Sequence, residues 1–249
     1  MSSNKLKLNE DKTEVMLIGT QTKLQTLELS PVVLSGCEIS VSKCVRNLGV
    51  QMDSSLLMDQ HISKLRKSCY FELRRISHLR PYISKEAAKK LICSFVSSRL
   101  DYCNSLLSNL PDTKLDKLQQ IQNSAARLVE KVPRRQHITP ILKQLHWLPI
   151  KARISYKIAT IVFQCNNDPM FPSYLKDLVT QYVPSRSLRS SGRKNLVKPR
   201  VQLKNYGQRS FSFMGPEIWN VLPEPIQSSN SLSVFKSKLK THLFVEYFS

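Results

Sequence analysis

The sequence predicts a mainly α protein with a small N-terminal β portion, an α+β fold in which strands precede a helical bundle. In the first 55 residues, short apolar runs alternate with turn residues, which is typical of β structure. From Asp59 onwards, apolar residues recur every three or four positions, the period of a helix with one buried side. With 249 residues, 41% of them hydrophobic, the chain can bury a sizeable core in one or two domains.

Three stretches of the N-terminal portion are predicted to form strands. Residues 15–18 are a short apolar run that ends at a turn residue. Residues 32–41 are predicted to form a hairpin that turns at Ser35–Gly36. Residues 45–53 read as a further strand, in which Gly49 indicates a bulge or the close approach of another backbone. So few strands do not make a stable sheet on their own.

The first long helix is predicted to begin at Asp59 and to end at Pro81. Its buried face carries Ile62, Leu65, Cys69, Leu73 and Ile76. The next helix is predicted to begin after Ser84, whose side chain can cap it, with Glu86 in the first turn.

Residues 97–132 lie at the centre of the predicted bundle, as two helices folded back on each other. The first should end before Pro111, because proline disfavours helix at the residue before it. Asp112 or Thr113 is predicted to cap the second. The apolar stripes are Ala88, Leu91, Ile92, Phe95, Leu100, Leu106 and Leu107 in the first helix, and Leu118, Ile121, Ala125, Leu128 and Val132 in the second. Facing stripes joined by a short turn predict antiparallel packing.

Further helices are predicted in the C-terminal part of the chain. Thr139 should cap a short helix that has Pro140 at its first position, and residues 147–149 should form a corner after it. The next helix carries its stripe at Ile154, Ile158, Ile161 and Cys165. Residues 174–179 are predicted to form a short helix, and Ser231 to cap a last amphipathic one.

The charge of the chain is large and unevenly distributed. The formal net charge is +20, from 38 basic and 18 acidic residues. Residues 1–60 hold six basic and seven acidic residues, which gives −1 and leaves +21 for the remainder. Residues 185–204 contain seven basic residues and no acid, and their serine content predicts an extended loop or flexible arm. This excess predicts an anionic partner, most simply nucleic acid, or else a solvated basic surface.

The six cysteines do not form a C-x-x-C motif, and no close pair of histidines completes a zinc site. Cys69, Cys93 and Cys165 are predicted to be reduced core cysteines of an intracellular protein, either nuclear or cytoplasmic. No signal peptide or membrane-length apolar run is apparent, so no membrane partner is predicted. The sequence also leads us to predict no cofactor, metal or small-molecule substrate. Cys103 with His137 or His146 could form a nucleophile pair, although a cysteine on an apolar helix is usually core.

Ten short motifs, in order along almost the whole chain, carry a resemblance to one family. They are KTE at 12–14, VRNLGVQMD at 45–53, HI at 61–62, SRLDYCNSLL at 98–107, QNSAARL at 122–128, HITP at 137–140, LHWLP at 145–149, RSLRSS at 186–191, WNVLP at 219–223 and FKSKLKTHLF at 235–244. In this order and spacing the chain resembles the C-terminal part of the reverse transcriptase of a LINE-type, non-LTR retrotransposon, a transposable element.

The resemblance implies a place for each segment. Residues 1–55 would be the end of the polymerase palm, with a primer-grip hairpin around Leu48–Gly49. Residues 56–135 would be a thumb-like helical bundle that packs on the template–primer duplex. Residues 136–249 would be the helical and extended basic C-terminal region.

The sequence lacks the catalytic carboxylates that the family uses. Such polymerases hold two magnesium ions with paired palm aspartates, and this chain contains no D-D pair. The nearest acids, Asp11 and Asp53, do not lie in such a motif. In the family the catalytic motifs lie upstream of the segment that begins at Lys12. We therefore expect no polymerase activity from this chain by itself.

Three interpretations of function follow. The chain is a fragment that acts as a non-catalytic nucleic-acid-binding module, a degenerate remnant with no biochemical role, or an RNA-directed DNA polymerase only as part of a longer chain. The expected ligand of the binding module is an RNA–DNA hybrid or a duplex, held by phosphate contacts with little sequence preference. The predicted nucleic-acid-binding residues are Arg46, Leu48, Gly49, Lys64, Arg66, Lys67, Arg186, Arg189, Arg193, Lys194, Lys198, Arg200 and Lys204.

Overall fold

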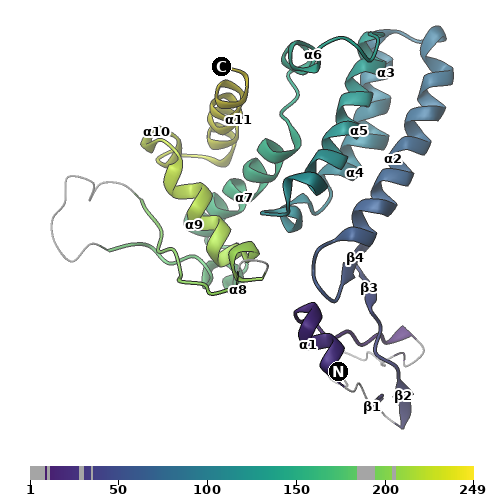
Figure 1. Ribbon diagram of the computed structural model, residues 1–249. Helices are drawn as coiled ribbons and strands as arrows, with labels where there is room; N and C mark the ends of the chain where they lie inside the picture. Colours follow the sequence, from purple (N-terminus) through teal and green to yellow (C-terminus); the bar gives the residue numbers. More distant parts are fainter. Residues whose placement is uncertain (1–8, 10–11, 28–30, 35, 184–193, 204–205) are drawn as a thin grey trace. The chain divides into compact units, whose positions relative to one another are not determined.

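The computed structural model describes residues 9, 12–27, 31–34, 36–183, 194–203 and 206–249 (Figure 1). The chain divides into two compact units, Met1–Lys64 and Leu65–Ser249. The described part is mainly helical and contains two antiparallel two-stranded hairpins, which confirms the predicted α+β class.

The first unit contains the two hairpins and a short helix. Its elements are α1 (Gln21–Thr26), β1 (Val32–Leu34), β2 (Cys37–Ile39), β3 (Cys44–Asn47), β4 (Val50–Asp53) and the first residues of α2 (Asp59–Leu79). The predicted hairpin at residues 32–41 is confirmed, since β1 pairs with β2 and Gly36 takes a positive φ of 88° in the turn. The period change predicted at Asp59 is confirmed by the start of α2.

Two strand predictions for this unit are wrong, and one helix was not predicted. Residues 15–18 do not form a strand; Val15 makes a single parallel bridge to Val41. Helix α1 was missed because its polar sequence shows no apolar stripe. Residues 45–53 are two strands, β3 and β4, rather than one.

The turn between β3 and β4 explains the second error. Leu48 and Gly49 both have positive φ angles, 46° and 87°. A two-residue loop with positive φ at both positions is the form that follows the twist of a hairpin. Gly49 therefore marks a turn and not a bulge. The resemblance implied a hairpin here, but its assignment to a primer grip stays a prediction.

In the described residues of the second unit, all the regular elements are helices. Its elements are the remainder of α2, η3 (Arg80–Tyr82), α3 (Lys85–Ile92), the π-helical η4 (Cys93–Ser97), α4 (Ser98–Asp101), η5 (Asn104–Leu107), α5 (Asp112–Glu130), α6 (Ile138–Leu145), α7 (Ile150–Asn167), α8 (Ser173–Lys176), η6 (Gly207–Arg209), α9 (Phe211–Val221), α10 (Glu224–Gln227) and α11 (Leu232–Phe248). Figure 1 shows α3 and α5 running alongside each other, and the two helices are in contact, as the facing stripes predicted.

Helix α7 is the centre of the C-terminal core, where it contacts α5, α9 and α11. The ring of Phe163 stacks on that of Phe235 at 4.3 Å, and Trp219 lies 5.9 Å from Phe235. Gly215 lets α9 approach closely, because a Cβ atom there would lie 3.1 Å from a methyl group of Val162. The predicted Ser231 cap is confirmed by a hydrogen bond from the Val234 backbone N–H.

The first helix of the central pair is shorter and less regular than predicted. It ends at Asp101, because Cys103 takes a left-handed conformation with φ 50°. The π-helical η4 puts Val96 into the core, whereas Phe95 is 44% exposed. Leu106, in the separate turn η5, is also exposed. A π segment adds a residue to one turn, so the buried face moves off a strict 3.6-residue stripe.

The predicted caps of α5 and α6 are wrong by one or two positions. Pro111 is the N-cap of α5 and has no side-chain hydrogen bond, while Asp112 lies within the first turn. His137 is the N-cap of α6, so Thr139 and Pro140 lie inside that helix. Proline fits the first turn of a helix because its missing N–H would have no partner there.

Candidate nucleic-acid interface

The predicted binding residues of the first unit are all exposed to solvent. Arg46 is exposed on β3, and its backbone N–H donates to Oε2 of Glu14 at 3.4 Å. Leu48 and Gly49 form the tip of the β3–β4 hairpin, where the Leu48 side chain is 84% exposed. Lys64 is exposed on α2. These placements leave the side chains open to a ligand.

Asp53, at the end of β4, has a structural role. Its carboxylate accepts hydrogen bonds from Ser55 Oγ at 2.7 Å, from the Leu57 N–H at 2.8 Å and from the Asp59 N–H at 3.2 Å. Burial raises the pKa of this carboxyl, but the hydrogen bonds outweigh burial and hold it below the ordinary value. The carboxylate therefore organises the turn that leads into α2.

Basic residues of α2 in the second unit differ in their surroundings. Lys67 and Arg74 are exposed, whereas Arg66 is half-buried and its Nε has no hydrogen-bond partner among the described residues. Arg75 is paired with Glu72 at 3.3 Å, and Glu72 also pairs with Arg99 at 3.0 Å. Lys67 and Arg74 are thus exposed cations of α2 that pair with no carboxylate within the described residues.

The predicted basic arm is only partly described. Arg186, Arg189, Arg193 and Lys204 lie outside the described residues. Lys194, Lys198 and Arg200 are described, and all three side chains are exposed.

Residues 194–200 contain no helix or strand, in agreement with the predicted extended loop, but they pack against α9, which the prediction did not include. Leu196 is 3% exposed, and its backbone N–H donates to Oδ1 of Asn220 at 2.8 Å. In return, Nδ2 of Asn220 donates to the Leu196 carbonyl at 2.9 Å. Trp219 Nε1 donates to the Lys194 carbonyl at 2.7 Å. Two further bonds join this segment to residues 180–182: the Tyr182 N–H donates to the Asn195 carbonyl at 2.9 Å, and the Val197 N–H donates to the Thr180 carbonyl at 2.8 Å. One buried leucine and these five hydrogen bonds hold a segment whose charges suggested a loop.

The charge of Lys198 is already engaged within the protein. Its ammonium forms an ion pair with Glu217 and lies 4.5 Å from the centre of the Phe213 ring. A cation held over an aromatic face next to a carboxylate has less to gain from a phosphate. Lys198 is therefore a weaker candidate than Arg200 for a nucleic-acid contact.

The cysteines behave as predicted at two of three positions. Cys69 and Cys165 are buried, and burial raises the pKa of Cys69 to about 11. Cys93 is exposed, contrary to the prediction, because it lies at the start of η4. No hydrogen bond joins Cys103 to His137 or His146 within the described part of the chain.

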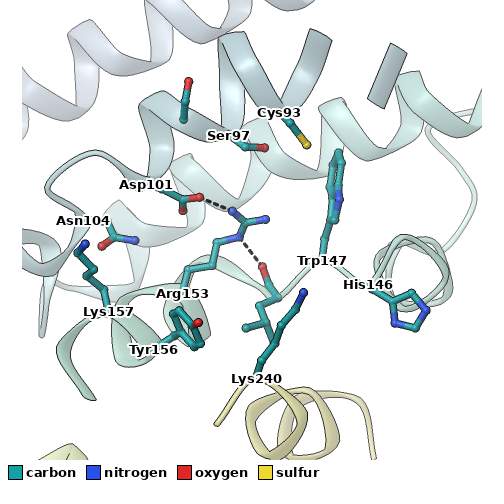
Figure 2. Close-up of a pocket in the computed structure, with 12 residues that line it drawn as sticks. Cys93, Ser97, Asp101, Asn104, His146, Trp147, Arg153, Tyr156, Lys157 and Lys240 are labelled. Carbon is teal, nitrogen blue, oxygen red and sulfur yellow. Dashed lines mark hydrogen bonds and ion pairs between the residues drawn. The ribbon is translucent and has the colours of Figure 1, made fainter. Parts of the chain in front are cut away.

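The structure brings together a basic pocket that the sequence did not reveal. It has a volume of about 550 Å³ and lies between α4, the corner before α7, α7 itself and α11 (Figure 2). Arg153, Tyr156 and Lys157 of α7 line it, together with Lys240 of α11. Arg153 and Lys157 are four residues apart, so a helix must place them on one face. That spacing was the available signal, but nothing in the sequence indicated what α7 would face.

The charges of this pocket are unequal. Arg153 Nη1 pairs with Oδ2 of Asp101 at 2.7 Å, and its Nε donates to the Leu148 carbonyl at 2.9 Å. Lys157 and Lys240 are exposed and form no ion pair with any residue that the structure describes. Three cations against one carboxylate give these lining residues a net charge of +2. Burial raises the pKa of Tyr156, so its hydroxyl stays protonated at neutral pH.

The described residues show neither a metal-binding cluster nor a membrane-spanning helix. No group of three or more His, Cys, Asp or Glu side chains there is placed to hold a metal ion. No helix in the same residues combines the length and apolarity needed to cross a membrane.

Comparison with known proteins adds no assignment. No family model, no curated protein and no solved structure matches the chain. The resemblance to LINE-type reverse transcriptases therefore rests on the sequence motifs alone.

Proposed function

We propose that this chain is a non-catalytic nucleic-acid-binding module, related to the end of the palm, the thumb and the C-terminal extension of a LINE-type reverse transcriptase. The observation that supports it is the +21 charge of residues 61–249, carried partly by exposed cations that have no carboxylate partner among the described residues. They include Lys67, Arg74, Lys157, Arg200 and Lys240.

Exposed cations without carboxylate partners can form ion pairs with phosphates without first breaking an internal pair. Such contacts release counterions, so they give affinity that depends on salt and little on base sequence. Lys67 and Arg74 are seven residues apart on α2, which places them on one face, about 10 Å apart along the helix axis. That length spans several phosphates of a duplex, which carries one charge per about 1.7 Å.

The experiment is a salt titration of binding to a labelled RNA–DNA hybrid. For the wild type we expect log affinity to fall linearly with log salt concentration. The variant Lys67→Ala/Arg74→Ala should flatten the slope by up to about two, at ~0.9 for each phosphate contact. The control Lys90→Ala/Lys117→Ala removes two exposed charges from other helices and should leave the slope nearly unchanged.

Two results would contradict the proposal. A wild-type chain that does not bind the hybrid at low salt would leave the interpretation as a remnant without a role. Equal slopes for the wild type and the Lys67→Ala/Arg74→Ala variant would show that these two residues of α2 do not contact phosphates of the hybrid.

The non-catalytic part of the proposal needs its own assay. We expect no templated nucleotide incorporation by the purified chain with magnesium or manganese, since no paired palm carboxylates are present. Asp53 supports this expectation, because its oxygens are occupied by backbone and hydroxyl donors. Incorporation above background that is lost in Asp53→Ala would overturn it.

A further inference from the structure

The pocket beside α7 combines apolar and aromatic walls with separated cations. Rings of Trp147 and Tyr156 contribute to its lining, and its volume of about 550 Å³ lies within the range of small-molecule sites. In Figure 2, Lys157 and Lys240 lie on opposite sides of the pocket, with Arg153 and Tyr156 between them. The two lysines belong to different helices, α7 and α11.

Asn104 adds an unsatisfied polar group to the same pocket. The residue is 5% exposed, and its Oδ1 is buried without a hydrogen-bond partner among the described residues. Leaving a buried amide oxygen unpaired is costly, so such groups in native proteins usually have a partner. An amide can both donate and accept, which suits the edge of a nucleobase.

The arrangement of Arg153 leaves the pocket positive. Asp101 is the carboxylate of the lining, and Arg153 neutralises it at 2.7 Å. The charges of Lys157 and Lys240 therefore remain available for a ligand. A ligand that suits both ends of the pocket has a flat, partly polar body with a negative group on each side.

We propose that this pocket binds one unpaired nucleotide of a single strand, with its base against Tyr156 and its two flanking phosphates on Lys157 and Lys240. Asn104 faces the edge of the base. Stacking on an aromatic ring combined with phosphate contacts is the general chemistry of single-strand binding. The inference deepens the proposed function and rests on it for the source of the strand. A free nucleoside monophosphate offers the same base, but a phosphate on one side only.

The test uses the full chain and three probes. The first is a short fluorescein-labelled oligothymidylate, the second is an abasic strand of equal length, and the third is thymidine monophosphate. The abasic strand keeps every phosphate, so the affinity difference between the two strands isolates the contribution of the base. For the wild type we expect the oligothymidylate to bind at least about tenfold more tightly than the abasic strand.

The variants separate the two halves of the proposed site. Tyr156→Ala should remove most of the difference between the two strands. Lys157→Ala/Lys240→Ala should weaken both strands. The control Lys117→Ala/Lys236→Ala also removes two charges, one of them from α11, but neither residue lines the pocket. It should weaken binding much less.

A second measurement covers the case in which Tyr156→Ala does not fold. An oligonucleotide that carries bromodeoxyuridine is cross-linked to the wild-type protein with ultraviolet light, and the adduct is mapped by mass spectrometry. We expect the adduct in the peptide that contains Tyr156. Adducts confined to other peptides would overturn the proposal.

The outcomes distinguish this inference from the proposed function. A chain that binds the hybrid, but binds the oligothymidylate and the abasic strand equally, keeps the proposed function and overturns the pocket. A chain that fails to bind the hybrid, but shows the base-dependent difference and the Tyr156 adduct, keeps the pocket and overturns the duplex module. Thymidine monophosphate that binds as tightly as the oligothymidylate would overturn the assignment of both lysines to flanking phosphates.

Discussion

Arg80 caps the C-terminal end of helix α5. It is 7% exposed, and its guanidinium donates to the carbonyls of Leu128 at 3.0 Å and Val129 at 2.8 Å, in the last turn of α5. A third bond reaches the Ile83 carbonyl at 2.9 Å. The last carbonyls of a helix have no partner within it and carry the negative end of its dipole, so a buried cation stabilises them.

We therefore predict that Arg80→Ala lowers the free energy of unfolding by about 2–4 kcal/mol, because it leaves buried carbonyls unpaired. Arg80→Lys should recover only part of this, since an ammonium lacks the planar fork that spans three acceptors. Urea denaturation followed by circular dichroism measures both changes. The control Arg75→Ala removes an exposed arginine and should change stability by at most about 1 kcal/mol. Equal losses for the two arginines would refute the role of Arg80.

The hydrogen bonds of the Asp53 carboxylate lead to a second prediction, on how the stability of its turn depends on pH. Its folded pKa lies below the ordinary value of 3.8, so its stabilising contribution is present above that value and is lost as the pH falls through the lower folded pKa. At neutral pH, Asp53→Asn should speed hydrogen exchange at the Leu57 and Asp59 amides. Below the folded pKa of Asp53, the variant and the wild type should exchange at similar rates. Glu38→Gln, on exposed β2, is the control; a pH-independent difference for Asp53→Asn would contradict the prediction.

At the scale of elements, α9 and residues 180–182 together hold residues 194–200. The α9 side chains Trp219 and Asn220 bond the backbone of a segment more than twenty residues earlier in the chain. We predict that Asn220→Ala, which removes both bonds to Leu196, costs about 1–3 kcal/mol. The variant should also be cut faster by trypsin after Lys194 and Arg200. Asn230→Ala removes an exposed asparagine and should not change the cleavage rate; unchanged cleavage in Asn220→Ala would refute the clamp.

The elements also show which parts of the fold the sequence could predict. Helix α2 was predicted close to its observed bounds, and the stripe predicted at residues 154–165 lies within α7, because the apolar period alone identifies such long helices. Helix α9 was missed, since Gly215 and Pro216 in its interior argue against a helix. The burial of Val96 in place of Phe95 depends on the π segment η4, which no local propensity signals.

For the candidate site, the sequence could not predict contacts between residues far apart in the chain. Of the α2 residues predicted to bind, Lys64 and Lys67 are exposed, whereas Arg66 is half-buried. The sequence could not show that Lys198 pairs with Glu217 or that Lys240 reaches the pocket beside α7. These contacts join segments separated by about twenty to eighty residues, and periodicity carries no information on such pairs.

At the scale of the whole molecule, the charge distribution predicts how the salt dependence of nucleic-acid binding changes when basic residues of 185–204 are replaced. Arg186, Arg189 and Arg193 precede the packed segment at residues 194–200. Replacing them removes none of the hydrogen bonds that join Lys194 and Leu196 to α9. If about six phosphates are neutralised in total, the log–log slope for a duplex should be about −5. The variant Arg186→Ala/Arg189→Ala/Arg193→Ala should flatten that slope by up to three contacts, and equally for all sequences, since phosphate contacts carry little sequence information.

The measurement is the same salt titration on a labelled hybrid, made with two unrelated base sequences. The control Lys90→Ala/Lys117→Ala/Lys236→Ala removes three exposed charges elsewhere and tests whether total charge alone sets the slope. Equal flattening by the two variants would mean that the run acts through net charge and not through direct contacts. An unchanged slope in the arginine variant, with native circular dichroism, would show that these arginines do not contact phosphates at all.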